Sequence, residues 1–78
     1  MGEVSTRTSA FAEFDAFFSV SSPRVLRQLM FIAGDAREAE DVTQEAFERA
    51  WLRWAAVRKC ESPEAWVRTV AHRLAVSR

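Results

Sequence analysis

Hydrophobic residues recur along most of this chain three or four positions apart, which is the spacing of one face of an α-helix. The longest stripe runs between residues 35 and 57, is widened by Phe47 and Trp51, and consists of Ala39, Val42, Ala46, Ala50, Trp54 and Val57. The chain contains only two Gly and two Pro, whereas an all-β fold needs turn residues at short intervals. The pattern therefore predicts an all-α fold, a small bundle of three to four helices with short loops.

Two helices are predicted before residue 35. The first begins at Ser9, and its apolar face carries Phe11, Phe14, Phe17 and Phe18. Ser22 then offers an N-cap and Pro23 a first helical position, so a second helix is expected to begin there. It would bury Val25, Leu26, Leu29, Met30 and Ala33. Gly34 can supply the left-handed residue that ends this helix.

Two further helices complete the prediction. Asp35 followed by Glu38 is a variant of the capping box, and no breaker interrupts the helix from there to about Val57. The segment RKCES forms a loop, and Ser62-Pro63 repeats the signal for a helix start. The last helix would bury Trp66, Val67, Val70, Ala71 and Leu74.

The 78 residues allow one domain, expected over residues 9–78 behind a flexible N-terminus at residues 1–8. The last helical pattern does not stop before the chain ends, which suggests a piece of a longer protein. No apolar run reaches the length of a membrane span, the N-terminus lacks an apolar signal core, and the one cysteine excludes an internal disulfide. A cytoplasmic location is expected.

Charge is balanced overall but divided locally. The formal net charge is zero, yet residues 35–48 hold six acids against one arginine. Residues 49–59 and 65–78 carry basic residues without any acid. An acidic segment beside a basic one suggests two surfaces for two different partners, although charged faces also occur simply as solvated surface.

The acidic segment places Asp41, Gln44, Glu45 and Glu48 at i, i+3, i+4 and i+7, on one side of the helix. These side chains lie off the apolar stripe and have no core to enter. They could accept charge-assisted hydrogen bonds from Arg and Lys of a partner helix. A solvated face is the alternative interpretation.

The residue types exclude most chemistry. One His, one Cys and no Gly-rich phosphate loop give neither a nucleophile with its base nor the ligands of a zinc site. We therefore expect no enzyme activity, no metal and no cofactor. The basic residues that interleave with Trp51 and Trp54 fit single-stranded nucleic acid, which takes cations for phosphates and aromatic rings for stacking. For Trp54, on the apolar stripe, a core position is the better interpretation.

Two stretches carry a family resemblance: GDAREAEDVTQEAFERAW, and SPEAWVRTVAHRLAVSR after the loop. From about Phe11 to Arg78 the chain resembles region 2 of the bacterial extracytoplasmic-function (ECF) sigma factors, members of the sigma-70 family. The resemblance implies the fold of that domain, a helical bundle. Region 4, the family's domain that reads the −35 promoter element, is absent from these residues.

The resemblance also implies partners and roles. Core RNA polymerase would bind, through the clamp helices of its β′ subunit, the face formed by Asp41, Gln44, Glu45 and Glu48. The loop from about Val57 to Ser62 would capture a base flipped out of the non-template strand of the −10 promoter element and so help to melt it. The residues expected to contact DNA are Arg53, Arg58, Lys59, Cys60, Glu61, Ser62, Trp66, Arg68, Thr69, His72 and Arg73. An anti-sigma factor is a further partner expected from the family, and no membrane is.

One alternative from another class stays open, a helical protein-interaction module that does not bind nucleic acid. The salt dependence of binding to single-stranded DNA distinguishes the two functions. In a DNA-binding domain, each phosphate-binding cation contributes about −0.7 to the slope of log affinity against log salt concentration, whereas an interaction module would not bind single strands at any salt concentration. An independent helix-turn-helix is a weaker alternative, because no helix combines a tight Gly-containing turn with a basic recognition face.

Overall fold

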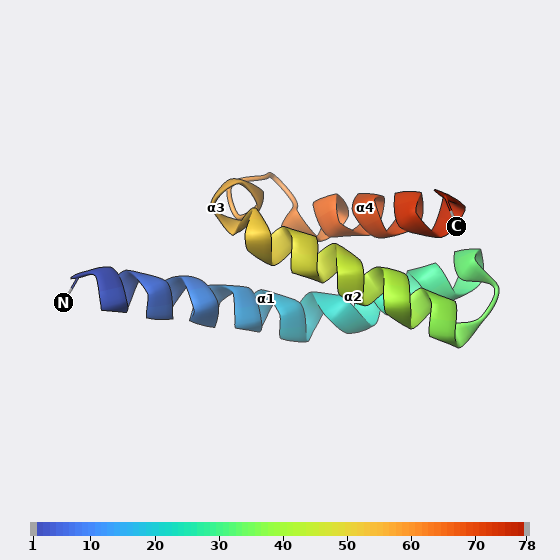
Figure 1. Cartoon of the computed structure of the whole chain (residues 1–78), viewed down its shortest axis with the longest axis horizontal. Helices are drawn as coiled ribbons and strands as arrows, with labels where there is room; N and C mark the ends of the chain where they lie inside the picture. Colours follow the sequence, from blue (N-terminus) through green and yellow to red (C-terminus); the bar gives the residue numbers. More distant parts are fainter. Residues whose placement is uncertain (1, 78) are drawn as a thin grey trace.

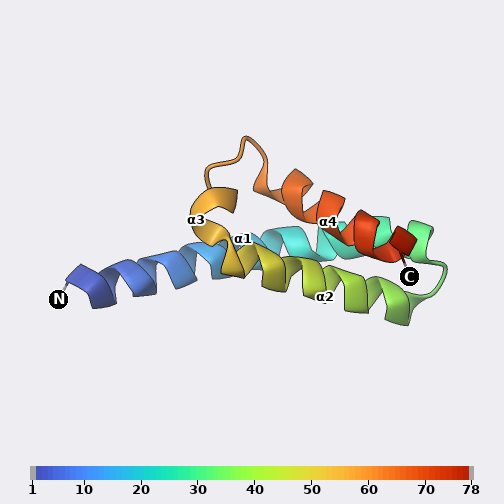
Figure 2. The ribbon, with the colours of Figure 1, turned by 45° about the horizontal axis from the view of Figure 1, so that its top comes forward.

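The computed structural model describes the backbone of residues 2–77 and the side chains of residues 9–77. Its elements are α1 (Gly2–Ala33), α2 (Ala36–Leu52), α3 (Trp54–Val57) and α4 (Pro63–Ser77). The three long helices run alternately up and down along one axis, and α3 is a single turn at the far end of α2 (Figure 1). The molecule is elongated, 47 × 19 × 18 Å, because α1 continues past the end of the other helices (Figure 2). The expected all-α bundle is confirmed.

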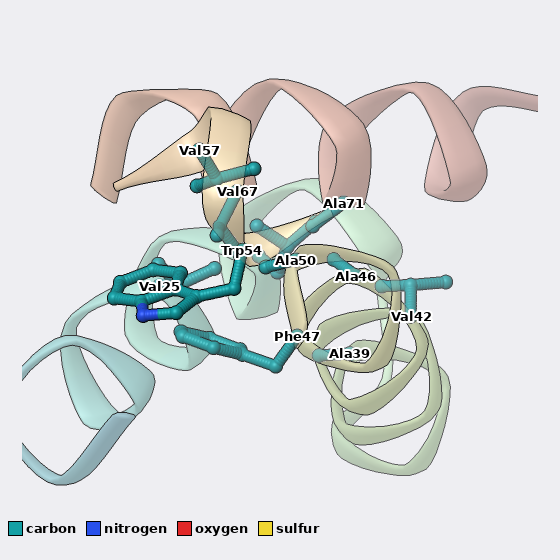
Figure 3. Close-up of a cluster of buried hydrophobic side chains, with 11 residues drawn as sticks. Val25, Ala39, Val42, Ala46, Phe47, Ala50, Trp54, Val57, Val67 and Ala71 are labelled. Carbon is teal, nitrogen blue, oxygen red and sulfur yellow. The ribbon is translucent and has the colours of Figure 1, made fainter. Parts of the chain in front are cut away.

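The core lies where α1, α2 and α4 meet. Its buried side chains converge between the ribbons of these helices (Figure 3). α1 contributes Val25 and Leu29, and α4 contributes Val67 and Ala71. The apolar stripe predicted from Ala39 to Val57 is buried at all six positions, with Phe47 beside it. Trp51 stays 41% exposed, so only one of the two widening aromatic residues belongs to the core.

The helix ends follow local rules. Gly34 has φ of 87°, the left-handed conformation expected after α1. The carboxylate of Asp35 accepts a 2.8 Å hydrogen bond from the backbone N–H of Glu38 and caps α2. The hydroxyl of Ser62 accepts one of 3.1 Å from the backbone N–H of Ala65 and caps α4. All three predicted signals are confirmed.

The predicted helix boundary at Ser22-Pro23 is wrong, because α1 passes through both residues without a break. Pro23 has no N–H to donate to the carbonyl of Ser19, four residues earlier, and its ring is exposed. The helix continues because Val25 and Leu29, beyond the proline, are completely buried against the other helices. Burial of Met30 was also wrong, since it is 47% exposed: Leu29 occupies the core face at that turn.

The single helix predicted from Asp35 to Val57 is divided at Arg53, whose φ of −115° and ψ of 24° are not helical. No Gly or Pro marks this point. The turn at Arg53 changes the direction of the chain, and in the following α3 the side chains of Trp54 and Val57 are buried. The flexibility expected of residues 1–8 stays a prediction; their backbone is helical from Gly2.

Replacing Pro23 by alanine should restore a backbone hydrogen bond to Ser19 and remove an unfavourable residue from a helix interior. We expect the free energy of unfolding of Pro23→Ala to rise by about 1–3 kcal/mol, measured by urea denaturation with an unchanged m-value. A decrease would contradict this explanation and would show that the proline itself is needed for packing.

Candidate functional site

The four residues of the predicted polymerase-binding side lie together on α2. Asp41, Gln44, Glu45 and Glu48 line one shallow depression, hereafter the acidic face. Glu45 is half-buried and the other three are exposed. The helical spacing that predicted a common side is therefore confirmed as geometry. Three carboxylates and an amide on one helix together offer hydrogen-bond acceptors and negative charge to solvent.

Glu45 also makes an ion pair within α2. Its Oε2 accepts a 2.8 Å hydrogen bond from Arg49, one turn along. Such a pair at i, i+4 contributes only a few tenths of a kcal/mol. It favours one position of the carboxylate without fixing it, and a partner's cation that approaches Glu45 would compete with Arg49.

An aromatic groove lies beside the acidic face, between α1 and α2. We define it by the side chains of Phe11, Phe14, Phe18, Phe47, Trp51 and Leu52. Gln44 and Glu48 belong to its wall as well as to the acidic face, so the two surfaces are continuous. Leu52 is 82% and Phe11 60% exposed. Thr43 also lines the groove, and its buried hydroxyl has no hydrogen-bond partner among the described residues. Sequence analysis missed this groove, because helical spacing marks the phenylalanines equally well as core.

The α3–α4 loop, residues 58–62, lies at the opposite end of α2 from the connection between α1 and α2 (Figure 1). All its residues are exposed. Backbone N–H groups of Lys59 and Cys60 donate to the carbonyls of Ala56 and Val57, at 3.2 and 3.0 Å, and these bonds tie the loop to α3. The loop thus offers Lys59, Cys60 and Glu61 to solvent on a short connection.

Arg58, the first residue of this loop, is held by a residue that sequence analysis did not select. Glu13 of α1 receives hydrogen bonds from Arg58 through both carboxylate oxygens, Nε to Oε1 at 2.7 Å and Nη2 to Oε2 at 3.0 Å. The indole N–H of Trp54 donates to the same Oε1 at 3.0 Å. The partners lie more than forty residues apart in sequence, so no local spacing pointed to the contact.

The contact between Glu13 and Arg58 changes the pKa of both side chains. Hydrogen bonding from Arg58 lowers the pKa of Glu13 against the opposing effect of burial, and Trp54 lowers it further. In return, the hydrogen bond to Glu13 raises the pKa of Arg58. The pair is therefore fully ionised near neutral pH.

A separate hollow lies between α1 and α4. Three predicted DNA-contacting residues, Arg68, Thr69 and His72, line it together with Gln28 and Ile32 of α1. The Thr69 hydroxyl donates to the carbonyl of Ala65 at 2.9 Å. Gln28 was not predicted, and its amide adds a donor and an acceptor to this hollow.

The remaining predicted DNA contacts are dispersed. Arg53 is exposed at the junction of α2 and α3, and Arg73 is exposed on α4; neither lines the hollow. Trp66 is half-buried and packs against the core. Ser62 caps α4 through its hydroxyl. The structure thus assembles Arg68, Thr69 and His72 in one place and the loop residues in another.

Among the described side chains, those of residues 9–77, no three His, Cys, Asp or Glu residues are grouped so that they could hold a metal ion. Within residues 2–77, no helix is long and apolar enough to cross a membrane.

Comparison with models of protein families identifies the family of this chain. The family model of sigma-70 region 2 matches residues 17–78, most of the chain. The chain belongs to the sigma-70 region 2 family. No curated protein and no solved structure matches it significantly. The chain is thus a sigma factor domain of transcription initiation, and the family is non-enzymatic. Members of this family bind core RNA polymerase and promoter DNA. The matched range of the sigma-70 region 2 family contains the acidic face, the loop and α4, whereas Glu13 precedes it.

Acid should break the contact between Glu13 and Arg58. A carboxylate whose pKa is lowered by folding stabilises the folded state above its unfolded pKa, and this contribution is lost as pH falls through the folded pKa. The Nε–H signals of Trp54 and Arg58 in NMR spectra should therefore be constant from neutral pH downward and shift together only below pH 4.5, the ordinary value for Glu13. A common midpoint at or above that pH would contradict the proposed network.

Proposed function

We propose that this chain is an ECF-type region 2 domain that binds the β′ clamp helices through the acidic face. In the same proposal, the α3–α4 loop captures a flipped base of the non-template −10 strand and α4 contacts the adjacent DNA. The observation that carries the proposal is the gathering of Asp41, Gln44, Glu45 and Glu48 in one depression of α2. The motif that resembles ECF sigma factors supplies these same four residues.

The surroundings of the acidic face favour a protein partner over a merely solvated surface. Protein interfaces combine a desolvated apolar centre, rich in aromatic residues, with a polar rim. Here the aromatic groove adjoins the acidic face through Gln44 and Glu48. A basic helix on the acidic face could bury part of the groove, with Leu52 and Trp51 as apolar contacts. Charge would set its register and apolar burial would add affinity.

The arrangement of the basic residues supports DNA binding at a separate place. Arg68 and His72 stand one turn apart on α4 and share a hollow with Gln28. Lys59 and the exposed loop lie ahead of α4 along the chain. Because Glu13 occupies the guanidinium of Arg58, the proposal assigns phosphate binding in the loop to Lys59. Because the net charge is zero, binding should depend on these local cations and decrease with salt.

The alternative function is a protein-interaction module that does not bind nucleic acid. The aromatic groove favours it, because such a groove could bind a protein whether or not the chain also binds DNA. An anti-sigma factor is a further partner expected from the family. The proposed contact with core RNA polymerase implies a cytoplasmic location, because bacterial transcription takes place in the cytoplasm.

The proposal predicts that Glu45→Arg combined with Gln44→Ala weakens binding to a β′ clamp-helix fragment at least tenfold, about 1.4 kcal/mol or more. The reversed charge would face the partner's cations and would also repel Arg49 at i+4. Affinity is measured by titration calorimetry or fluorescence anisotropy, and helix content by circular dichroism.

Asp15→Arg is the control, because it makes the same change of charge on exposed α1 outside the acidic face and the groove. It should leave the affinity almost unchanged. Equal losses in both variants would attribute the effect to net charge. A folded wild-type chain that does not bind the fragment would refute the proposed polymerase contact.

A further inference from the structure

We infer that Glu13 is a positioning residue for the α3–α4 loop: its carboxylate fixes the turn α3 and the first loop residue, and so sets the conformation in which the loop reads a base. The inference rests on the proposed function of the loop. It concerns a residue outside the range that matches the family.

One carboxylate holds two consecutive parts of the chain. Its contact with Arg58 uses both oxygens and two guanidinium nitrogens, a geometry that fixes orientation as well as distance. Its Oε1 also accepts from the Trp54 indole, which is 6% exposed and belongs to the core. Glu13 therefore connects the buried start of α3 with the exposed start of the loop.

The segment of α1 that carries Glu13 is packed against the end of α2 and against α3 by aromatic side chains. The neighbouring Phe14 packs its ring against Trp51 and Trp54, with centroid distances of 5.2 and 5.1 Å. Phe17, one turn further on, packs against Trp54 at 5.2 Å. These contacts fix the position of α1 relative to the end of α2 and hence the position of the Glu13 carboxylate.

The effect reaches the loop through its backbone. Lys59 and Cys60 donate to carbonyls of α3, and so a change in the direction of α3 moves both residues. If Glu13 is neutralised, the ring contacts of Trp54 still anchor the start of α3, whereas Arg58 loses the ionised, two-oxygen partner that orients it. Loop conformation should therefore respond more strongly than overall stability, because an exposed ion pair contributes little to folding.

A different role for Glu13 gives opposite results. If Glu13 merely masked the charge of Arg58, its removal would free a cation for phosphate. Binding to every single strand would then become tighter, with a salt slope steeper by about 0.7. If Glu13 positions the loop, its removal lowers the preference for one base and leaves sequence-independent binding almost unchanged.

The experiment compares Glu13→Gln with Glu64→Gln. Glutamine keeps the size of Glu13 but puts an NH₂ group opposite one of the Arg58 donors. Glu64 is the matched control, because it also pairs with an arginine, Arg24 at 3.5 Å, but joins α1 to the first turn of α4 and makes no hydrogen bond with Arg58 or Trp54. Two readouts are used on the full chain: the mobility of a nitroxide attached to Cys60, the only cysteine, and affinity for short thymidine strands that differ only in their central base.

We expect the nitroxide to become more mobile in Glu13→Gln but not in Glu64→Gln, and the affinity ratio between the best and worst central base to fall about threefold in Glu13→Gln only. Arg58→Lys should behave alike, since lysine cannot make the two-pronged contact, and the two changes together should not be additive. Thermal midpoints should be almost equal in all variants.

Unchanged nitroxide mobility in Glu13→Gln, or tighter binding to every strand, would overturn the inference. If the wild type has no preference for any central base, the proposed base capture fails, and nitroxide mobility alone decides whether Glu13 positions the loop. A large fall in the thermal midpoint of Glu13→Gln would likewise overturn it in favour of a purely structural role.

Discussion

The packing of the Trp54 indole against Phe14 and Phe17 of α1 is the contact on which the rest of the structure depends. The indole is buried, its N–H is satisfied by Glu13, and its position fixes the turn α3 at the end of α2. The loop that follows and the start of α4 take their places from that turn. A large aromatic ring suits this task because it buries much apolar area and carries one polar atom that needs a partner.

This anchoring divides the molecule into two working regions. The acidic face lies along α2, next to the aromatic groove, whereas Lys59 lies in the loop, and Arg68 and His72 line the hollow between α1 and α4. The acidic face and the proposed DNA contacts of the loop and α4 thus lie on separate surfaces of a chain with no net charge, which suits a domain of a sigma factor that meets both polymerase and promoter DNA. Neither region needs a conformational change of the core to present its side chains.

Local rules accounted for what the sequence predicted correctly. Asp35, Gly34 and Ser62 act on their own neighbours, and the stripe from Ala39 to Val57 follows directly from helical periodicity. The same rules failed at Pro23, where burial of Val25 and Leu29 outweighs a local signal for a helix start, and at Arg53, where a break has no breaker. Glu13 could not be found, because its partners are distant in sequence and an acid on an exposed helix turn carries no pattern. Spacing predicted the shared side of Asp41, Gln44, Glu45 and Glu48, but the grouping of Arg68, Thr69 and His72 with Gln28 required the packing of α1 against α4.

The central claim is that two different partners use two different surfaces, and NMR mapping of the ¹⁵N-labelled chain tests it most directly. The chain is titrated first with a β′ clamp-helix fragment and then with −10 single-stranded DNA. The account predicts that the fragment shifts the signals of residues 41–48, and that DNA shifts those of the loop and of α4 around Arg68 and His72. Shifts of one common set of residues by both partners would contradict it. Shifts by the fragment and none by DNA would favour an interaction module without nucleic-acid binding.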